Sequence, residues 1–110
     1  MFPNEFEDDD PSFTAIFYNS LPYPIDFYGY DFEGRKLQIS KEVKRGHERT
    51  EKTSLMIPWV FVKSEDNSKR LFAFAKDTAG DIFKGKDFHA NYNTTIHVII
   101  NDNGKFYYNS

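Results

Sequence analysis

Three histidines, His47, His89 and His97, are the side chains of this sequence best suited to proton transfer or metal binding near neutral pH. His47 and His89 fall in turn-like segments, and no carboxylate stands at metal-ligand spacing from either of them. His97 lies in an alternating segment, on the side expected to face solvent. The chain contains no cysteine, which excludes thiolate zinc sites and cysteine nucleophiles. We therefore expect no catalytic residue, no metal site and no cofactor, and predict that the protein is not an enzyme.

Two further motifs have simple structural explanations. Residues 101–104, Asn-Asp-Asn-Gly, resemble part of a calcium-binding loop, but Ile99 and Ser110 occupy the positions where that loop needs Asp and Glu. A hairpin turn explains these residues better. Residues 93–95, Asn-Thr-Thr, form a glycosylation sequon, which matters only in a secreted protein.

Charge is unevenly distributed along the chain. The net charge is -3, and acidic side chains are concentrated in residues 1–11, where Asp8, Asp9 and Asp10 are consecutive. We interpret residues 1–11 as a flexible acidic leader and residues 12–110 as one domain. The basic side chains of residues 41–52 are interrupted by three glutamates. Because phosphate contacts need a sustained positive surface, we expect no nucleic-acid partner.

Aromatic residues make up 18% of the chain, including 12 Phe and 7 Tyr. Tyr28 and Tyr30 stand two residues apart, so they share one face of a strand. Together with Trp59, the single tryptophan, they offer apolar rings with polar tips, which suit protein recognition. Ordinary cross-strand packing is the alternative explanation.

Alternation of apolar and polar residues predicts most of the strands. It is clearest in residues 12–18, with Phe13, Ala15 and Phe17 inward, and in residues 94–101, with Ile96, Val98 and Ile100 on one face. Further strands are predicted over residues 25–32, 36–40, 49–55, 81–84 and 105–108. In the first of these, the glycine at position 29 indicates a bulge or a close approach by another backbone. In the second, the apolar residues at 37 and 39 are expected to point inward. Turns are expected over 76–80 and at 103–104, and a loop over 85–93.

The two densest apolar runs are residues 54–62 and 71–75, separated by the charged residues 63–70. We expect these runs to form neighbouring antiparallel strands joined by a polar turn. With seven or eight short strands and regular turns, the predicted fold is an all-β, seven- to eight-stranded antiparallel β-sandwich, with a closed barrel as the alternative. Since no signal peptide or apolar run long enough to cross a membrane is visible, we expect a soluble, cytoplasmic protein without a membrane partner.

Four short motifs, at residues 15–22, 31–34, 43–46 and 59–61, follow one another along the chain. Their order resembles that of the β domain of the von Hippel-Lindau tumour suppressor family. Residues 15–22, Ala-Ile-Phe-Tyr-Asn-Ser-Leu-Pro, are similar to its first strand, and residues 31–34, Asp-Phe-Glu-Gly, to its Asn-Phe-Asp-Gly turn. Residues 43–46, Val-Lys-Arg-Gly, stand where it has Leu-Pro-Pro-Gly. Residues 59–61, Trp-Val-Phe, follow at the same spacing and resemble its Trp-Leu-Phe strand. The resemblance covers residues 14–62.

This resemblance implies a seven-stranded sandwich that binds a hydroxyproline-bearing peptide along a sheet edge. Trp59 matches the tryptophan of the family's pocket, and Thr53 falls at its serine and keeps the hydroxyl. Ile57 falls at the histidine that bonds the hydroxyl of the ligand, which isoleucine cannot do. A second pocket tryptophan aligns near Gly29, and the pocket tyrosine falls around Ile39 or Ser40.

These observations lead to the expectation of a non-enzymatic domain that binds a protein or peptide partner. Its expected contact residues are Tyr28, Tyr30, Thr53, Ile57 and Trp59, with a degenerate hydroxyproline pocket. The family's helical domain, which recruits elongin C, has no room before Ser110, so neither oxygen sensing nor ligase recruitment is expected. The alternative is a small carrier or lectin-like domain that holds an apolar or sugar ligand among Phe72, Phe74, Phe83 and Phe88.

Overall fold

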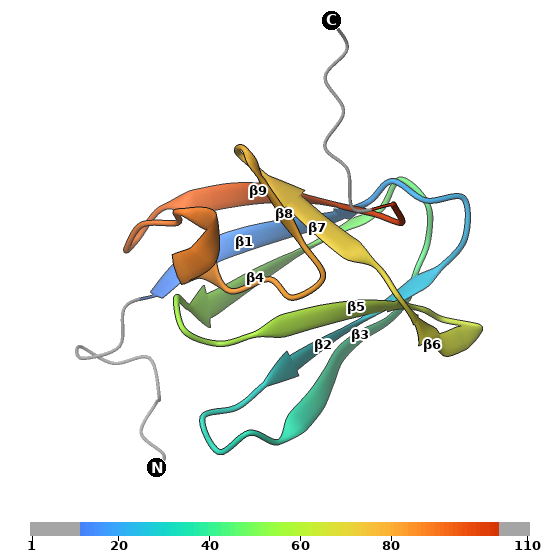
Figure 1. The fold of residues 1–110 in the computed structure, drawn as a ribbon, viewed down its shortest axis with the longest axis horizontal. Helices are drawn as coiled ribbons and strands as arrows, with labels where there is room; N and C mark the ends of the chain where they lie inside the picture. The colour runs from blue at the N-terminus through green and yellow to red at the C-terminus, as the bar shows by residue number, and fades with distance from the viewer. Residues whose placement is uncertain (1–11, 104–110) are drawn as a thin grey trace, which may run out of the picture.

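A computed structural model describes residues 12–103 of the 110-residue chain, and within this range nine strands form two facing sheets (Figure 1). The five-stranded sheet has the order β4-β1-β9-β7-β8, and the four-stranded sheet has the order β3-β2-β5-β6. This arrangement confirms the predicted all-β sandwich. The strands are β1 (Ser12–Asn19), β2 (Ile25–Tyr30), β3 (Lys36–Val43), β4 (Glu48–Ser54), β5 (Trp59–Lys63), β6 (Asp66–Arg70), β7 (Phe72–Ala75), β8 (Thr78–Gly80) and β9 (Thr95–Asn101).

The core is built from aromatic rings contributed by both sheets. Phe17, in the middle of the inward face of β1, is fully buried. Its ring centroid lies 5.0 to 5.5 Å from the centroids of the four rings around it, those of Phe27, Trp59, Phe61 and Phe83. Offset and edge-to-face contacts at these distances are favourable for aromatic rings. The predicted inward faces of the first strand and of residues 94–101 are both confirmed by their burial.

The first strand, β1, pairs antiparallel with β4 and parallel with β9. The expectation of a wholly antiparallel sandwich is therefore wrong at this one pairing. Thr14 is aligned with Thr95, about 80 residues later in the chain. A connection this long lets the chain return in either direction, whereas a tight hairpin permits only antiparallel pairing.

The predicted hairpin between the two densest apolar runs is not formed. β5 pairs with β6 instead, and β7 lies in the other sheet beside β8 and β9. The fully buried Leu71 marks the crossing between the sheets, and its N–H donates to the carbonyl of Phe61 at 2.9 Å. The polar residues of β6, predicted as a turn, form an exposed edge strand, because an edge strand needs no apolar side chains.

Smaller differences concern the strand boundaries. Residues 81–84, predicted as a strand, contribute only an isolated bridge between Phe83 and Trp59, while β8 forms within the predicted turn 76–80. The predicted loop 85–93 begins with a short 3-10 helix, η1 (Gly85–Phe88). The register of β2 against β3 shifts between Ile25 and Tyr28, so of the two possibilities predicted for Gly29 the bulge is not found at that residue.

Three of the sequence predictions, the acidic leader, the turn at 103–104 and the strand 105–108, lie wholly or partly outside the described residues. Within residues 12–103, no helix has the length and apolar character needed to cross a bilayer.

Asn19, which is fully buried at the end of β1, fixes the connection from β3 to β4. Its side-chain amide donates to the carbonyls of Tyr23 and Val43, both at 2.9 Å, and its Oδ1 accepts the N–H of Leu21 at 2.8 Å. Its main chain also bonds the turn after β3, since its carbonyl accepts the N–H of Gly46 at 2.8 Å. These bonds hold β3 and β4 in different sheets, each at an edge.

Candidate functional site

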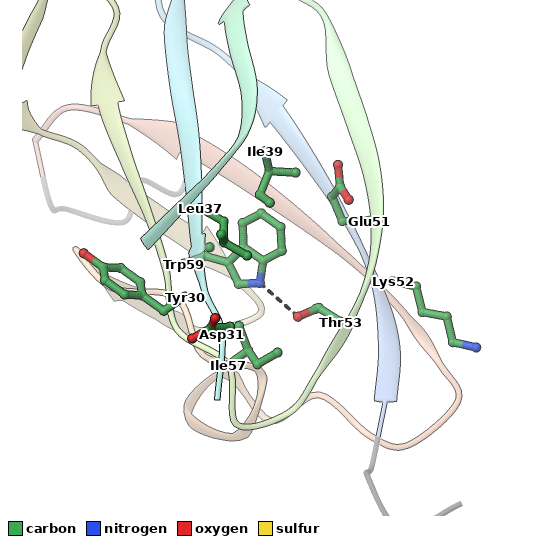
Figure 2. Close-up of a pocket in the computed structure, with 10 residues that line it drawn as sticks. Tyr30, Asp31, Leu37, Ile39, Glu51, Lys52, Thr53, Ile57 and Trp59 are labelled. Carbon is green, nitrogen blue, oxygen red and sulfur yellow. Dashed lines mark hydrogen bonds between the residues drawn. The ribbon is translucent and has the colours of Figure 1, made fainter. Parts of the chain in front are cut away.

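A pocket of about 240 Å³ opens between the edge strands β3 and β4 (Figure 2). In the described part of the chain, β3 pairs only with β2 and β4 pairs only with β1, so the two sheets are open to solvent along this side. The pocket is the gap between these two edges. It is lined by Gly29, Tyr30, Asp31, Leu37, Ile39, Glu51, Lys52, Thr53, Ile57 and Trp59.

The inner wall of the pocket is apolar. Trp59 and Ile57 are buried and belong to the main core, whereas Leu37 and Ile39 on β3 are 47% and 39% exposed. Gly29 is aligned with both Trp59 and Leu37. A Cβ atom at Gly29 would lie 3.6 Å from the indole ring, so the glycine leaves that space open to the pocket.

The indole of Trp59 is held in place by a buried hydrogen bond. Its Nε1–H donates to the Oγ1 of Thr53 on β4 at 3.0 Å, and both residues are less than 5% exposed (Figure 2). The bond joins the two sheets at the base of the pocket. On its other side the ring packs against Phe17 at a centroid distance of 5.0 Å. Because Trp59 is fixed on both sides, the pocket has a preformed floor.

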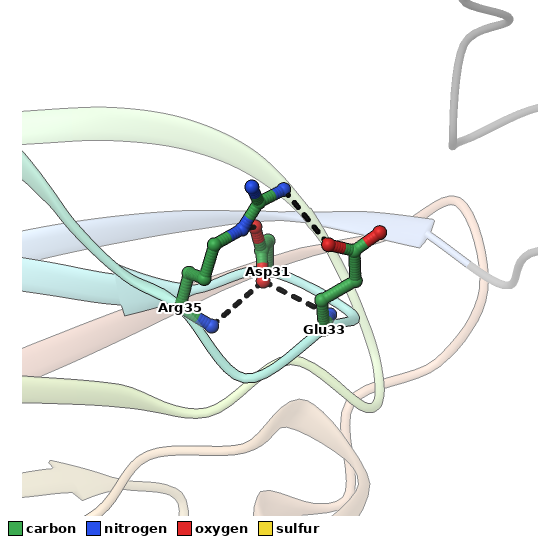
Figure 3. A network of polar contacts seen from close by, with 3 residues as sticks. All are labelled: Asp31, Glu33 and Arg35. Carbon is green, nitrogen blue, oxygen red and sulfur yellow. Dashed lines mark hydrogen bonds and ion pairs between the residues drawn. The ribbon is translucent and has the colours of Figure 1, made fainter.

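At one end of the pocket, Asp31 organises the turn between β2 and β3 (Figure 3). Its Oδ1 accepts the N–H groups of Glu33 and Arg35 at 2.9 and 2.8 Å, and its Oδ2 accepts the Arg35 Nε–H at 2.8 Å. The bond from the Arg35 main chain, followed by the other bonds and the guanidinium charge, lowers the pKa of Asp31 below its ordinary value. The carboxylate of Asp31 is therefore already occupied by this turn.

Glu51, on β4, is the other acidic side chain of the pocket. Partial burial raises the pKa of its carboxyl above the ordinary value, while the nearby charge of Arg49 lowers it to a smaller extent. Within residues 12–103, Glu51 takes part in no hydrogen bond or ion pair through its carboxylate. The neighbouring Lys52 contributes to the wall, but its side chain points away from the pocket (Figure 2). Among the described residues, Glu51 thus has no ion-pair partner at the pocket, and the charge of Arg49 acts on it only from beyond ion-pair distance.

Four of the five predicted contact residues line the pocket, and the fifth, Tyr28, lies on the outer face of the four-stranded sheet. Thr53, Ile57 and Trp59 lie together in the pocket. Tyr30 also lines it, but its ring points away from the other lining side chains (Figure 2). Tyr28 does not line it, because it faces the outer side of the four-stranded sheet.

On that outer side, Tyr28 packs with Val60, Val62 and Tyr30 in a small second apolar cluster. Its hydroxyl donates to Asn67 Oδ1 at 3.1 Å, and the ammonium group of Lys36 lies 4.2 Å from its ring centroid. The register explains the separation: Tyr28 pairs with Val60, and the next pair, Gly29 with Trp59, faces the opposite way.

Four residues that line the pocket were not predicted as site residues: Asp31, Leu37, Glu51 and Lys52. Leu37 and Ile39 were predicted to point inward. Both apolar side chains do point toward the inner side, but they remain exposed because, in the described sheets, β3 is an edge strand with no further strand beside it. The sequence did indicate a pocket position for Ile39, since the pocket tyrosine of the von Hippel-Lindau family falls around Ile39 or Ser40. It gave no such indication for Glu51, because the position of Glu51 depends on β4 being an edge.

The phenylalanines proposed for the alternative carrier function are not brought together. Phe83 and Phe88 pack in the core with a centroid distance of 4.7 Å. Phe72 and Phe74 alternate along β7 with the core residues Ala73 and Ala75, so they point to the other face of their sheet.

The three histidines of the chain, His47, His89 and His97, are all exposed, as predicted for His97. In the described range, no group of three His, Asp or Glu side chains is arranged to hold a metal ion.

No protein-family model matches this chain, and no curated protein is significantly similar to it in sequence.

Proposed function

We propose that this domain binds an extended segment of another polypeptide along the free edge of β3, with one side chain of that segment in the pocket over Trp59. The observation that carries the proposal is the position of the pocket, which opens between two unpaired strand edges of the described sheets. An added strand obtains its main-chain hydrogen bonds from such an edge, and pockets beside the edge select its side chains.

The chemical character of the two edges favours β3. In β4 every residue from Glu48 to Lys52 is charged or a threonine, and charged side chains, lysine above all, discourage strand addition. The charged residues of β3 lie toward its two ends, whereas residues 37–40 in between are uncharged. Leu37 and Ile39 in this middle segment are exposed on the side of the pocket, and an apolar edge segment without charges is a typical site of strand pairing.

The resemblance to the von Hippel-Lindau β domain supports the same site. Thr53, Ile57 and Trp59, which correspond to positions of that family's pocket, line this pocket. So do Gly29, near which its second tryptophan aligns, and Ile39, one of the two positions, Ile39 and Ser40, around which its tyrosine falls. The isoleucine in place of histidine removes the donor and acceptor for a hydroxyl group, so recognition of hydroxyproline is not part of the proposal. Tyr28 is also left out, since it lies on the other face of the sheet.

The test is a substitution that blocks the edge without touching the core. Ile39→Lys places a charge on the exposed wall of the pocket, and Ile99→Lys is the matched control. Ile99 is the same residue type with similar exposure, 46% against 39%, but it lies on β9 in the other sheet. We expect peptides selected on the wild-type domain to bind Ile99→Lys normally and to lose at least about tenfold in affinity for Ile39→Lys, corresponding to roughly 1.4 kcal/mol. Equal binding to both variants would exclude this edge.

A further inference from the structure

We infer that the bound segment carries an aliphatic residue for the pocket and, two positions away, a lysine or arginine whose charge meets Glu51. This inference rests on the proposed function and specifies the chemistry of its ligand. The occupant is a peptide strand with the pattern aliphatic-x-basic, in either chain direction.

The aliphatic preference follows from the groups that reach into the pocket. Leu37, Ile39, Ile57 and the indole of Trp59 provide apolar surface. The buried Thr53 hydroxyl already accepts the Nε1–H of Trp59 at 3.0 Å. A polar group of the ligand that left water for this wall would lose hydrogen bonds that the wall does not replace. An aliphatic side chain has no such cost.

The basic residue follows from the charge at the pocket. Glu51 is partly buried, and no cation in the described residues forms an ion pair with it. The nearby cations form no ion pair with it: the Lys52 side chain points away, and Arg49, whose charge acts on Glu51 from beyond ion-pair distance, donates its Nη1–H to the carbonyl of Glu48 at 2.9 Å. Asp31, the other carboxylate of the pocket, is already paired with the guanidinium of Arg35 in its own turn, so Glu51 is the carboxylate left for a ligand. A cation on the ligand is the complement of this arrangement.

The spacing of two follows from strand geometry. Thr53 and Glu51 both face inward on β4, since they are aligned with Phe13 and Ala15 on β1. Residues two apart in a strand are separated by about 6.7 Å. A peptide strand beside β3 also directs every second side chain into the gap. If one such side chain lies over Trp59 at the level of Thr53, the next inward one lies at the level of Glu51.

The experiment is a selection of random dodecapeptides displayed on phage against the wild-type domain, Glu51→Gln and Ile39→Lys, each checked for folding by circular dichroism. We expect the wild-type pool to be enriched in an aliphatic residue with lysine or arginine two positions away. The Glu51→Gln pool should keep the aliphatic residue and lose the basic one. The Ile39→Lys pool should show neither.

Two peptides are then titrated into the domain: a tryptophan-free peptide from the wild-type pool, and its counterpart with norleucine in place of the basic residue. Binding is followed by the fluorescence of Trp59, the single tryptophan of the chain. Partly exposed ion pairs contribute only modestly to the free energy of binding. The norleucine peptide should therefore bind the wild-type domain about two- to fivefold more weakly than the parent peptide, and should bind Glu51→Gln as tightly as the parent does. Binding peptides without the basic preference, or with the same preference in Glu51→Gln, would overturn this inference and leave the proposed function intact. Equal enrichment on Ile39→Lys would overturn both.

Discussion

The hydrogen bond between Trp59 and Thr53 gives a sharp test of how the pocket floor is held. In Thr53→Val the side chain keeps a similar shape, but the Nε1–H of Trp59 loses its acceptor at a site where both residues are less than 5% exposed. A buried donor without a partner costs about 1–3 kcal/mol. For a domain of this size, each kcal/mol lowers the melting temperature by roughly 4–8 °C.

The measurement is urea denaturation followed by far-UV circular dichroism, because the fluorescence of Trp59 is itself changed by the substitution. Thr50→Val is the matched control: it makes the same change on the same strand at an exposed position. Its free energy of unfolding should stay within about 0.5 kcal/mol of the wild type.

A double-mutant cycle isolates the bond itself. Trp59→Phe keeps an aromatic ring and removes the donor, so in this background Thr53→Val should cost much less than in the wild type. The expected coupling energy is about 1–2 kcal/mol, within the range for residues in direct contact. If Thr53→Val costs no more than Thr50→Val, or if the two buried substitutions are additive, the bond does not hold the pocket floor.

Three further predictions concern the scaffold around the pocket. Asn19→Ala removes three buried hydrogen bonds and should lower the free energy of unfolding by about 3 kcal/mol or more, measured in urea. Gly85→Ala places a Cβ atom against the ring of Phe13 and should lower the free energy of unfolding by about 1–3 kcal/mol. Gly80→Ala is the control, because a Cβ atom there would make only ordinary contacts. Equal melting temperatures of the two variants would contradict the expected clash at Gly85. Because folding lowers the pKa of Asp31, its ionised carboxylate stabilises the folded state at pH values above the ordinary pKa, and this stabilisation is lost as the pH falls through the pKa of the folded state. Arg35→Ala should raise the pKa of Asp31 measured by an NMR titration of the carboxyl group. An unchanged pKa would show that the side chain of Arg35 does not contribute to the shift.

Much of the strand structure was predictable because alternation is a local property. The inward residues of β1 and β9 were identified correctly, since a period of two fixes which side chains share one face of a strand. The exposure of His97 was predicted for the same reason. Three of the predicted contact residues, Thr53, Ile57 and Trp59, were selected through short motifs that resemble those of a known family, and the structure places them in one pocket.

The main failures concern how strands pair and which face of a sheet a side chain occupies. The apolar runs around Trp59 and Phe74 were predicted as partners, yet they lie in different sheets. Tyr28 was grouped with Trp59, although the register of β2 against β5 points the two rings to opposite faces. Both errors arise because local patterns do not contain the pairing of strands, which depends on contacts between distant parts of the chain.

The sequence by itself determined the class of fold, the aromatic composition of the core and the side chains that each strand can turn inward. Only the tertiary structure decided that β3 and β4 lie at open edges, that Leu37 and Ile39 stay exposed, and that Glu51 borders an apolar pocket without an ion-pair partner among the described residues. The physical reason is that alternation sets the direction of a side chain, whereas burial depends on the neighbour that covers it. Along the edges of β3 and β4 the described sheets supply no such neighbour, and the proposed peptide would take its place.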